Sequence, residues 1–92
     1  MKKPKGINMY LRELRVQSGI TQLEAARSLG HQTAQYISNL ERGLCEPSVE
    51  MAVVLTERYG GSRKKLENVM LRLYVKQLRA RLNGAPGGSP LR

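Results

Sequence analysis

The sequence is poor in the residues that build disulfides, metal sites and membrane spans. It has a single cysteine and a single histidine among 92 residues. One cysteine excludes an internal disulfide and gives no metal framework, so we interpret Cys45 as a loop residue without a chemical role. No apolar run approaches the roughly 18 residues of a membrane helix, and no signal peptide is visible. We therefore expect a cytoplasmic chain with no membrane partner.

Catalytic and cofactor-binding patterns are also missing. The sequence shows no Ser/His/Asp set, no paired carboxylates and no glycine loop of the kind that cradles phosphate. The lone His31 has no Cys, Asp or Glu near it at ligand spacing. Two interpretations of His31 stay open: a turn residue that touches phosphate, and a ligand or pH switch. We predict no enzyme activity, no metal and no cofactor.

Acidic residues are few, and the basic excess is unevenly distributed. Sixteen Lys and Arg against seven Asp and Glu leave a net charge of +9. This balance suits a polyanionic partner, although many small soluble domains are basic without binding one. Residues 1–60 carry eight basic and six acidic side chains, net +2, whereas residues 61–92 carry eight and one, net +7. Most of the excess charge therefore belongs to the last third of the chain.

Apolar spacing and helix-breaking residues divide the chain, which at this length makes one domain with a small core. Apolar residues recur at three- and four-residue spacing, which predicts helices and no strand. The expected helices cover residues 7–17, 22–29, 34–41, 49–59 and 62–82. A basic arm, 1–6, precedes them and a Gly/Pro-rich tail, 83–92, follows, and we expect disorder in both. The prediction is an all-α domain over 7–61 with a long C-terminal helix over 62–82.

Residues 21–43 predict two short helices joined by a tight turn. Thr21 is followed three residues later by Glu24, which is a capping-box pattern at the start of the first helix. Gly30 follows the last apolar position of that helix, where a left-handed stop is expected. Thr33 then offers a hydroxyl cap for the second helix. This arrangement is typical of a helix-turn-helix unit.

The second of these helices is predicted to expose a polar face. Its spacing turns Ile37 and Leu40 inward and leaves Gln35, Ser38 and Asn39 outside. Amide side chains on a short helix match the donor and acceptor edges of the DNA major groove. We therefore interpret this helix as a reader of double-stranded DNA, the alternative being a set of plain solvated polar residues.

The long last helix is predicted to have two apolar faces in succession. Its first half presents Leu66, Val69, Met70 and Leu73. Its second half presents a face rotated by roughly a quarter turn or more, made of Leu71, Tyr74, Val75, Leu78 and Leu82. Two faces indicate two neighbours, so we predict that the first covers the domain and the second forms a homodimer interface. The alternative is that the second face covers the first helix of the same chain.

Two basic segments lie outside the helix-turn-helix. The arm contributes three lysines that are candidates for following the DNA backbone or a minor groove: Lys2, Lys3 and Lys5. The last helix carries a narrow basic stripe made of Lys65, Arg72, Lys76 and Arg79. The stripe is either a solvated face or a contact for an anionic partner, such as flanking DNA or an acidic protein.

Together these residues resemble the Cro/CI-type (XRE) helix-turn-helix family of bacterial and phage transcriptional regulators. The resemblance covers about residues 10–60. It rests on the segments 11–15, 19–22, 25–26, 29–30, 37–43 and 47–48, taken in order. It implies a five-helix, lambda repressor-like all-α fold with the third helix in the major groove. It also implies DNA binding, usually as a dimer, and transcriptional control.

The resemblance also implies roles for single residues. Gln35 and Asn39 fall at base-reading positions, and Ala34 beside them is placed to touch a thymine methyl group. The positions implied for the DNA backbone are Gln22, Thr33, Ser38, Arg42 and Tyr36. For Tyr36 a packing role stays equally open. Arg15 and Glu41 match a pair that forms a structural salt bridge, which orients the reading helix more than it stabilises the fold.

Three features depart from the family pattern. One extra residue separates Gly30 from Thr33, compared with the commonest turn. Ala34 replaces a glutamine that often braces the backbone-contacting glutamine, so that brace is expected to be absent. The loop over residues 44–46 reads Leu-Cys-Glu where basic or polar residues are common, and it is expected to contribute less to phosphate binding.

Two functions are consistent with the sequence. The first is a homodimeric, sequence-specific DNA-binding transcriptional regulator, in the simplest case a repressor that recognises an inverted repeat. The second is an antitoxin or co-regulator module whose C-terminal helix docks a partner protein, such as a toxin, a sigma factor or another acidic protein.

Overall fold

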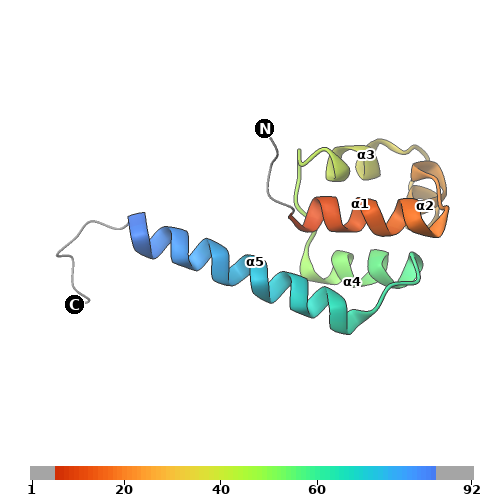
Figure 1. The fold of residues 1–92 in the computed structure, drawn as a ribbon. Helices are drawn as coiled ribbons and strands as arrows, with labels where there is room; N and C mark the ends of the chain where they lie inside the picture. Colours follow the sequence, from red (N-terminus) through yellow and green to blue (C-terminus); the bar gives the residue numbers. More distant parts are fainter. Residues whose placement is uncertain (1–5, 85–92) are drawn as a thin grey trace.

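The computed structural model describes residues 6–84. Within this range the chain forms five α-helices and no strand (Figure 1). The helices are α1 (Ile7–Ser18), α2 (Gln22–Ser28), α3 (Gln35–Glu41), α4 (Val49–Arg58) and α5 (Arg63–Gly84). The predicted all-α class with an extended last helix is confirmed. The helix ends differ from the predicted ones by at most two residues. The arm lysines lie outside the described residues, as does the predicted tail from residue 85 onward.

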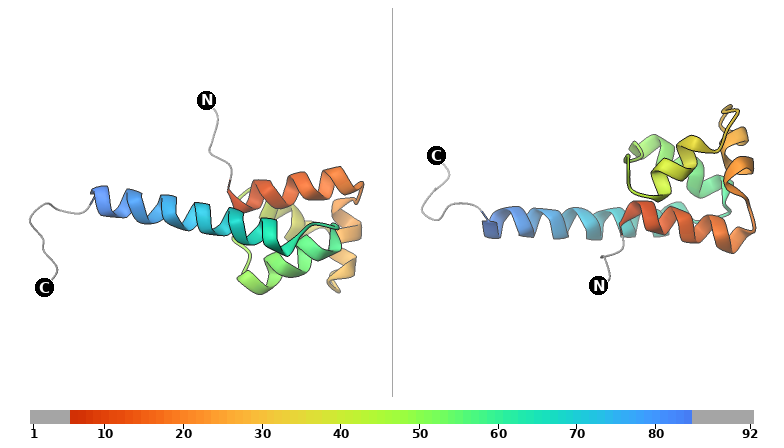
Figure 2. Two further views of the ribbon diagram at one scale, coloured as in Figure 1. Left: turned by 60° about the horizontal axis from the view of Figure 1, so that its bottom comes forward. Right: turned by 90° about the horizontal axis from the view of Figure 1, so that it is seen from above.

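Helix α1 is the centre of the arrangement. It lies between α3 and α4, and α2 packs across its C-terminal end (Figure 1). The helices in contact are α2 with α3, α4 with α5, and α1 with α3, α4 and α5. The further views show that only the first part of α5 runs beside the other helices, and that the remainder projects beyond them (Figure 2). The described residues therefore extend over 51 × 29 × 25 Å.

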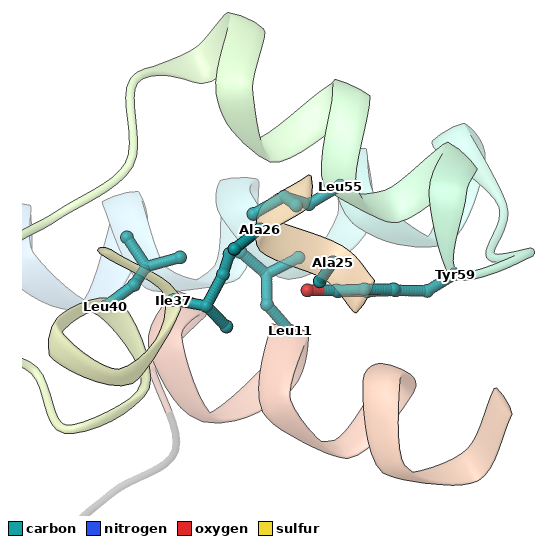
Figure 3. Packing of buried hydrophobic residues seen from close by; sticks show 7 residues of the cluster. All are labelled: Leu11, Ala25, Ala26, Ile37, Leu40, Leu55 and Tyr59. Atoms are coloured by element: carbon teal, nitrogen blue, oxygen red, sulfur yellow. The ribbon is translucent and has the colours of Figure 1, made fainter. Parts of the chain in front are cut away.

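The core is small, and its main cluster draws on α1, α2, α3 and α4. Its cluster of buried apolar side chains comprises Leu11, Ala25, Ala26, Ile37, Leu40, Leu55 and Tyr59 (Figure 3). In α2 the apolar Leu23 is 38% exposed, and the buried face of the helix consists of Ala25 and Ala26. Small side chains let the α2 backbone approach its neighbours closely, and the helix against which α2 packs is α3.

Side-chain caps begin three of the helices. At α2, the Thr21 hydroxyl accepts from the Glu24 N–H and the Glu24 carboxylate accepts from the Thr21 N–H, which completes the expected capping box. Ser48 caps α4 by accepting from the Met51 N–H at 3.1 Å. Ser62 accepts from the N–H groups of the second and third residues of α5. These hydroxyls and carboxylates satisfy donors that a helix start leaves unpaired.

The start of α3 differs from the prediction. Its N-cap is Ala34, and no side chain caps it. Thr33 lies one residue earlier, where its hydroxyl accepts from the Gln35 N–H at 3.3 Å. The expected cap at Thr33 is therefore wrong. Ala34 intervenes between the Thr33 hydroxyl and the first residue of α3, so this hydroxyl reaches only the Gln35 N–H.

Two left-handed glycines bracket the turn and α3. Gly30 has a φ of 89° and Gly43 a φ of 80°, a region that residues with a Cβ rarely adopt. After α2, the His31 N–H donates to the Ala26 carbonyl at 3.0 Å and the Gly30 N–H donates to the Arg27 carbonyl at 2.9 Å. This is the Schellman pattern, which pairs the last carbonyls of a helix and reverses the chain.

Helix α5 divides into a covered half and an exposed half. In the first half Leu66 is 2% exposed, and Val69, Met70 and Leu73 are half-buried. The five apolar residues predicted as a dimer interface are all exposed, by 38% to 65%: Leu71, Tyr74, Val75, Leu78 and Leu82. The alternative that they cover the first helix of the same chain is therefore wrong.

Thr56, on α4, is a buried polar residue in an apolar position. Its side chain is fully buried, and its Oγ1 atom has no hydrogen-bond partner. The residue packs at the end of the linker to α5, where its carbonyl accepts from the Gly61 N–H at 2.8 Å. A buried hydroxyl without a partner costs about 1–3 kcal/mol relative to an apolar group of the same shape.

Replacing Thr56 by valine is expected to raise the free energy of unfolding by about 1 kcal/mol, because valine keeps the shape and removes the unpaired hydroxyl. Urea denaturation followed by circular dichroism measures this change. The matched control is Thr21→Val, which removes a hydroxyl that caps α2 and should destabilise by about 1 kcal/mol. A loss of stability in Thr56→Val would mean that its hydroxyl has a partner in solution.

Candidate nucleic-acid interface

Helix α3 presents one polar face outward because its other face is anchored in the core. Ile37 is 0% exposed and Leu40 is 1% exposed. On the opposite side Gln35 and Arg42 are exposed and Asn39 is half-buried. The structure thus brings together on one surface the amides predicted to read bases and an arginine predicted to contact the backbone.

These three side chains form a hydrogen-bonded row along α3. The Nε2 amine of Gln35 donates to Oδ1 of Asn39 at 2.9 Å. The Nη2 group of Arg42 donates to the same Oδ1 atom, also at 2.9 Å. The spacing of four and three residues places the groups on neighbouring turns of one helix face. The row therefore limits the rotamers of all three side chains before any DNA is present.

An ion pair between α1 and α3 fixes the orientation of this helix. Arg15 donates from Nε to Oε2 of Glu41 at 2.5 Å and from Nη2 to Oε1 at 3.0 Å. The two side chains are 12% and 4% exposed. Arg15 also donates from Nη1 to the carbonyl of Ile20 at 2.8 Å. The hydrogen bonds to Glu41 raise the pKa of Arg15. A two-pronged geometry of this kind resists rotation of α3 about its axis.

Gln22 lies against the same carboxylate. Its Nε2 amine donates to Oε1 of Glu41 at 2.9 Å. The family pattern assigns a brace for Gln22 to the position of Ala34. Here Glu41, seven residues or about two turns further along the chain, takes that place. One amide hydrogen and the carbonyl oxygen of Gln22 have no role in this bond. The amide is therefore oriented by α3 while it keeps groups that can meet a phosphate.

The buried Tyr59 lies close enough to Arg15 and Glu41 to feel their charges. Its side chain is 4% exposed. Burial first, and the negative charge of Glu41 second, raise the pKa of Tyr59 to about 12, with Arg15 acting in the opposite direction. The phenol is therefore neutral at physiological pH. The Glu41 carboxylate is thus paired with the half-buried Arg15, hydrogen-bonded to the Gln22 amide, and joined by the more exposed Arg12, whose Nε lies 3.9 Å from Oε1.

Asn8 is a positioning residue that the sequence interpretation missed. Its Nδ2 amine donates to the carbonyl of Leu40 at 2.6 Å and to that of Cys45 at 2.9 Å. One amide thus ties the last turn of α3, and the loop after it, to the first turn of α1. The available signal was the place of Asn8 three residues before Leu11, on the buried face of α1.

His31 and Tyr36 stack on each other at the turn before α3. Their ring centroids are 5.2 Å apart and the ring planes are inclined by 10°. Tyr36 is half-buried, and burial, followed by the charge of Cys45, raises its pKa. The stack gives Tyr36 a packing role, which was one of its two interpretations. Among residues 6–84 there is no group of three His, Cys, Asp or Glu that can hold a metal ion.

The remaining predicted residues differ in exposure. Ala34 and Ser38 are half-buried, and Thr33 is exposed at the turn. Leu44, in the loop with the atypical composition, is 65% exposed. The four residues of the basic stripe on α5 are all exposed: Lys65, Arg72, Lys76 and Arg79.

Comparison with known proteins gives one informative match. A family model described as Helix-turn-helix matches residues 11–66. Comparison with curated proteins and with solved structures gives no match. The matched range contains α1 to α4 and the buried Leu66 of α5. In the described part of the chain, none of the helices combines the length and the apolar character of a membrane span.

Removing the Glu41 carboxylate is expected to weaken the fold. Glu41→Ala leaves Arg15 without its partner, and the loss of one member of a buried pair costs about 3 kcal/mol. Chemical denaturation measures the change. The control is Glu57→Ala, which breaks an ion pair of 2.6 Å to Arg63 whose side chains are 51% and 69% exposed. That exposed pair contributes less than about 1 kcal/mol, so equal effects would argue against a buried clamp at Glu41.

Proposed function

This chain belongs to the Cro/CI-type (XRE) helix-turn-helix family, a family of DNA-binding regulators, and from that premise we propose that it is a homodimeric repressor of transcription. In this proposal each α3 enters the major groove of one half of an inverted repeat in double-stranded DNA. The observation that carries it is the exposed amide row of α3, held in one orientation by the buried Arg15–Glu41 pair. The proposal includes a cytoplasmic location, because that is where a bacterial or phage regulator meets DNA.

The proposed contacts divide into base-reading and positioning groups. Gln35 and Asn39 face base edges, with Ala34 near a thymine methyl group. Groups around them contact the phosphates and fix the register without reading sequence: Gln22, Thr33, Ser38, Arg42 and Tyr36. Because Gln22 is held by Glu41 and Tyr36 by the stack with His31, two of these contacts come from side chains of limited mobility.

The second copy in the proposed dimer lies on the exposed apolar face of α5. That face consists of Leu71, Tyr74, Val75, Leu78 and Leu82, each at least 38% exposed. A groove of about 540 Å³ between α4 and α5 shares Leu71 and Tyr74 with it and adds Val49 and Val53. A contiguous apolar surface of this kind is typical of an interaction site.

Two-fold symmetry would set the two α3 helices about 34 Å apart, one turn of DNA. The repressor occludes a promoter in the simplest mechanism.

A second candidate function is a module that docks an acidic protein through α5. It is favoured by the net charge of +7 in residues 61–92 and by the exposed basic stripe. Removal of the whole of α5 would not separate the two candidates cleanly, since Leu66 belongs to the buried core. Substitutions on the projecting half of α5 avoid this difficulty.

A genomic-fragment binding selection with the full-length protein at two salt concentrations tests the proposed function. A regulator should enrich one inverted-repeat motif, and the enrichment should persist at the higher salt concentration. Fragments without a shared motif, retained at low salt alone, would indicate nonspecific electrostatic binding. That result would contradict sequence-specific regulation and favour the protein-docking candidate.

Gln35→Ala is expected to relax the selected motif at one base-pair position in each half-site. The loss of a bidentate contact costs about 1–3 kcal/mol of discrimination, or roughly 5- to 150-fold. Enrichment profiles of the variant and the parent protein measure the change. The matched control is Gln17→Ala, an exposed glutamine on α1, which should leave the motif unchanged. An unaltered motif in Gln35→Ala would mean that α3 does not dock as proposed.

Leu78→Glu is expected to weaken the dimer at least about tenfold, since a charge at a buried contact costs more than 1.4 kcal/mol. Sedimentation equilibrium measures the association, and binding to a two-half-site operator should weaken with it. The control is Val16→Glu, an apolar residue of α1 that is 53% exposed. A parent protein that stays monomeric at operator-binding concentrations would rule out the α5 interface.

A further inference from the structure

We propose that Asn39 selects a keto base, guanine or thymine, because it acts toward DNA as a hydrogen-bond donor only. This inference rests on the proposed function and adds to it the class of base that one side chain recognises. It follows from the hydrogen bonds that Gln35, Asn39 and Arg42 make with one another in the absence of DNA.

Arg42 fixes which way the Asn39 amide is turned. A guanidinium group has only donors, so the Asn39 atom 2.9 Å from Nη2 of Arg42 has to be the carbonyl oxygen. The opposite orientation would place two donors against each other. The Nδ2 amine of Asn39 therefore points away from Arg42, and its two hydrogens are the groups that the side chain has left for a ligand.

The same oxygen, Oδ1 of Asn39, also fixes the orientation of the Gln35 amide. The Gln35 atom that lies 2.9 Å from Oδ1 of Asn39 has to be its amine, since an oxygen there would oppose an oxygen. Oδ1 of Asn39 then accepts two hydrogen bonds, which is the number of its lone pairs. Gln35 keeps one amine hydrogen and its whole carbonyl oxygen.

The two amides are consequently complementary to different bases. Adenine is recognised by one amide that both donates, to N7, and accepts, from the N6 amine. Gln35 retains both functions, whereas Asn39 has no acceptor left. To bind adenine, Asn39 has to break its bonds to Gln35 and Arg42, and the bond to Arg42 is strengthened by the guanidinium charge. Guanine O6 and N7 and thymine O4 accept hydrogen bonds without offering a donor at the same edge.

The hydrogen-bonded row thus gives two side chains of similar chemistry different recognition properties. Gln35 and Asn39 carry the same functional group, and the general match of an amide side chain to adenine does not distinguish between them. The charge of Arg42 makes them unequal by occupying one of the two carbonyl oxygens. Arg42 therefore acts as a positioning residue for base selection, in addition to any contact with phosphate.

The variant Asn39→Asp tests this inference. A carboxylate keeps acceptors for Gln35 and Arg42 but replaces the outward amine by an oxygen. In a selection on randomised half-sites, one position should change from a keto base to an amino base, cytosine or adenine, with relative preference shifting at least about tenfold. Arg42→Ala should give a different change, the admission of adenine at that position, because it frees a lone pair of Oδ1.

A matched control separates base reading from loss of charge or fold. Asn68→Asp introduces the same change on an exposed residue of α5 and should leave every position of the motif unaltered. Thermal unfolding by circular dichroism should show each variant folded, since Asn39 hydrogen-bonds only with side chains of its own helix face.

The possible outcomes distinguish this inference from the proposed function. A clear motif in which Asn39→Asp leaves all base preferences unchanged overturns the inference and leaves the regulator intact. The same holds if the parent protein selects adenine at the position that Asn39→Asp alters. Absence of any shared motif in the parent protein overturns the proposed function, and the inference with it.

Discussion

Glu41 is the group on which the orientation of α3 depends. Its carboxylate is almost fully buried, and it accepts hydrogen bonds from Arg15 on α1 and from Gln22 at the start of α2. Both oxygens are therefore committed to other helices, and α3 cannot rotate without leaving a buried charge unpaired. Asn8 adds a second attachment at the carbonyl of Leu40. The polar row of α3 is presented by a helix that is fixed at its C-terminal end.

The turn before α3 is held in a different manner. No side chain caps the helix start at Ala34. The chain instead reverses through the left-handed Gly30, and the stacked rings of His31 and Tyr36 bridge the turn to the helix. This end has fewer hydrogen bonds to the core than the end at Glu41. We expect adjustment to DNA to occur at the turn, because that is where the restraints are weakest.

Helix α5 combines two surfaces that a single domain does not need together. Leu66 completes the core, whereas Leu78 and Leu82 are exposed far along the projecting half. An apolar face without an intramolecular neighbour is stabilised only by a partner. One continuous helix thus joins a residue of the buried core to an exposed apolar face.

The sequence alone was sufficient for the features that arise within a few residues. The capping box at Thr21, the left-handed Gly30 and the outward face of α3 all follow from local spacing, because their partners lie within about one turn. The tertiary structure decided the rest. The bond from Gln22 to Glu41 joins residues 19 apart, and the bonds of Asn8 join residues 32 and 37 apart. Such contacts depend on how the helices pack, which side-chain periodicity does not specify. The start of α3 at Ala34, one residue after the Thr33 hydroxyl that the sequence offers as a cap, was likewise visible only in the structure.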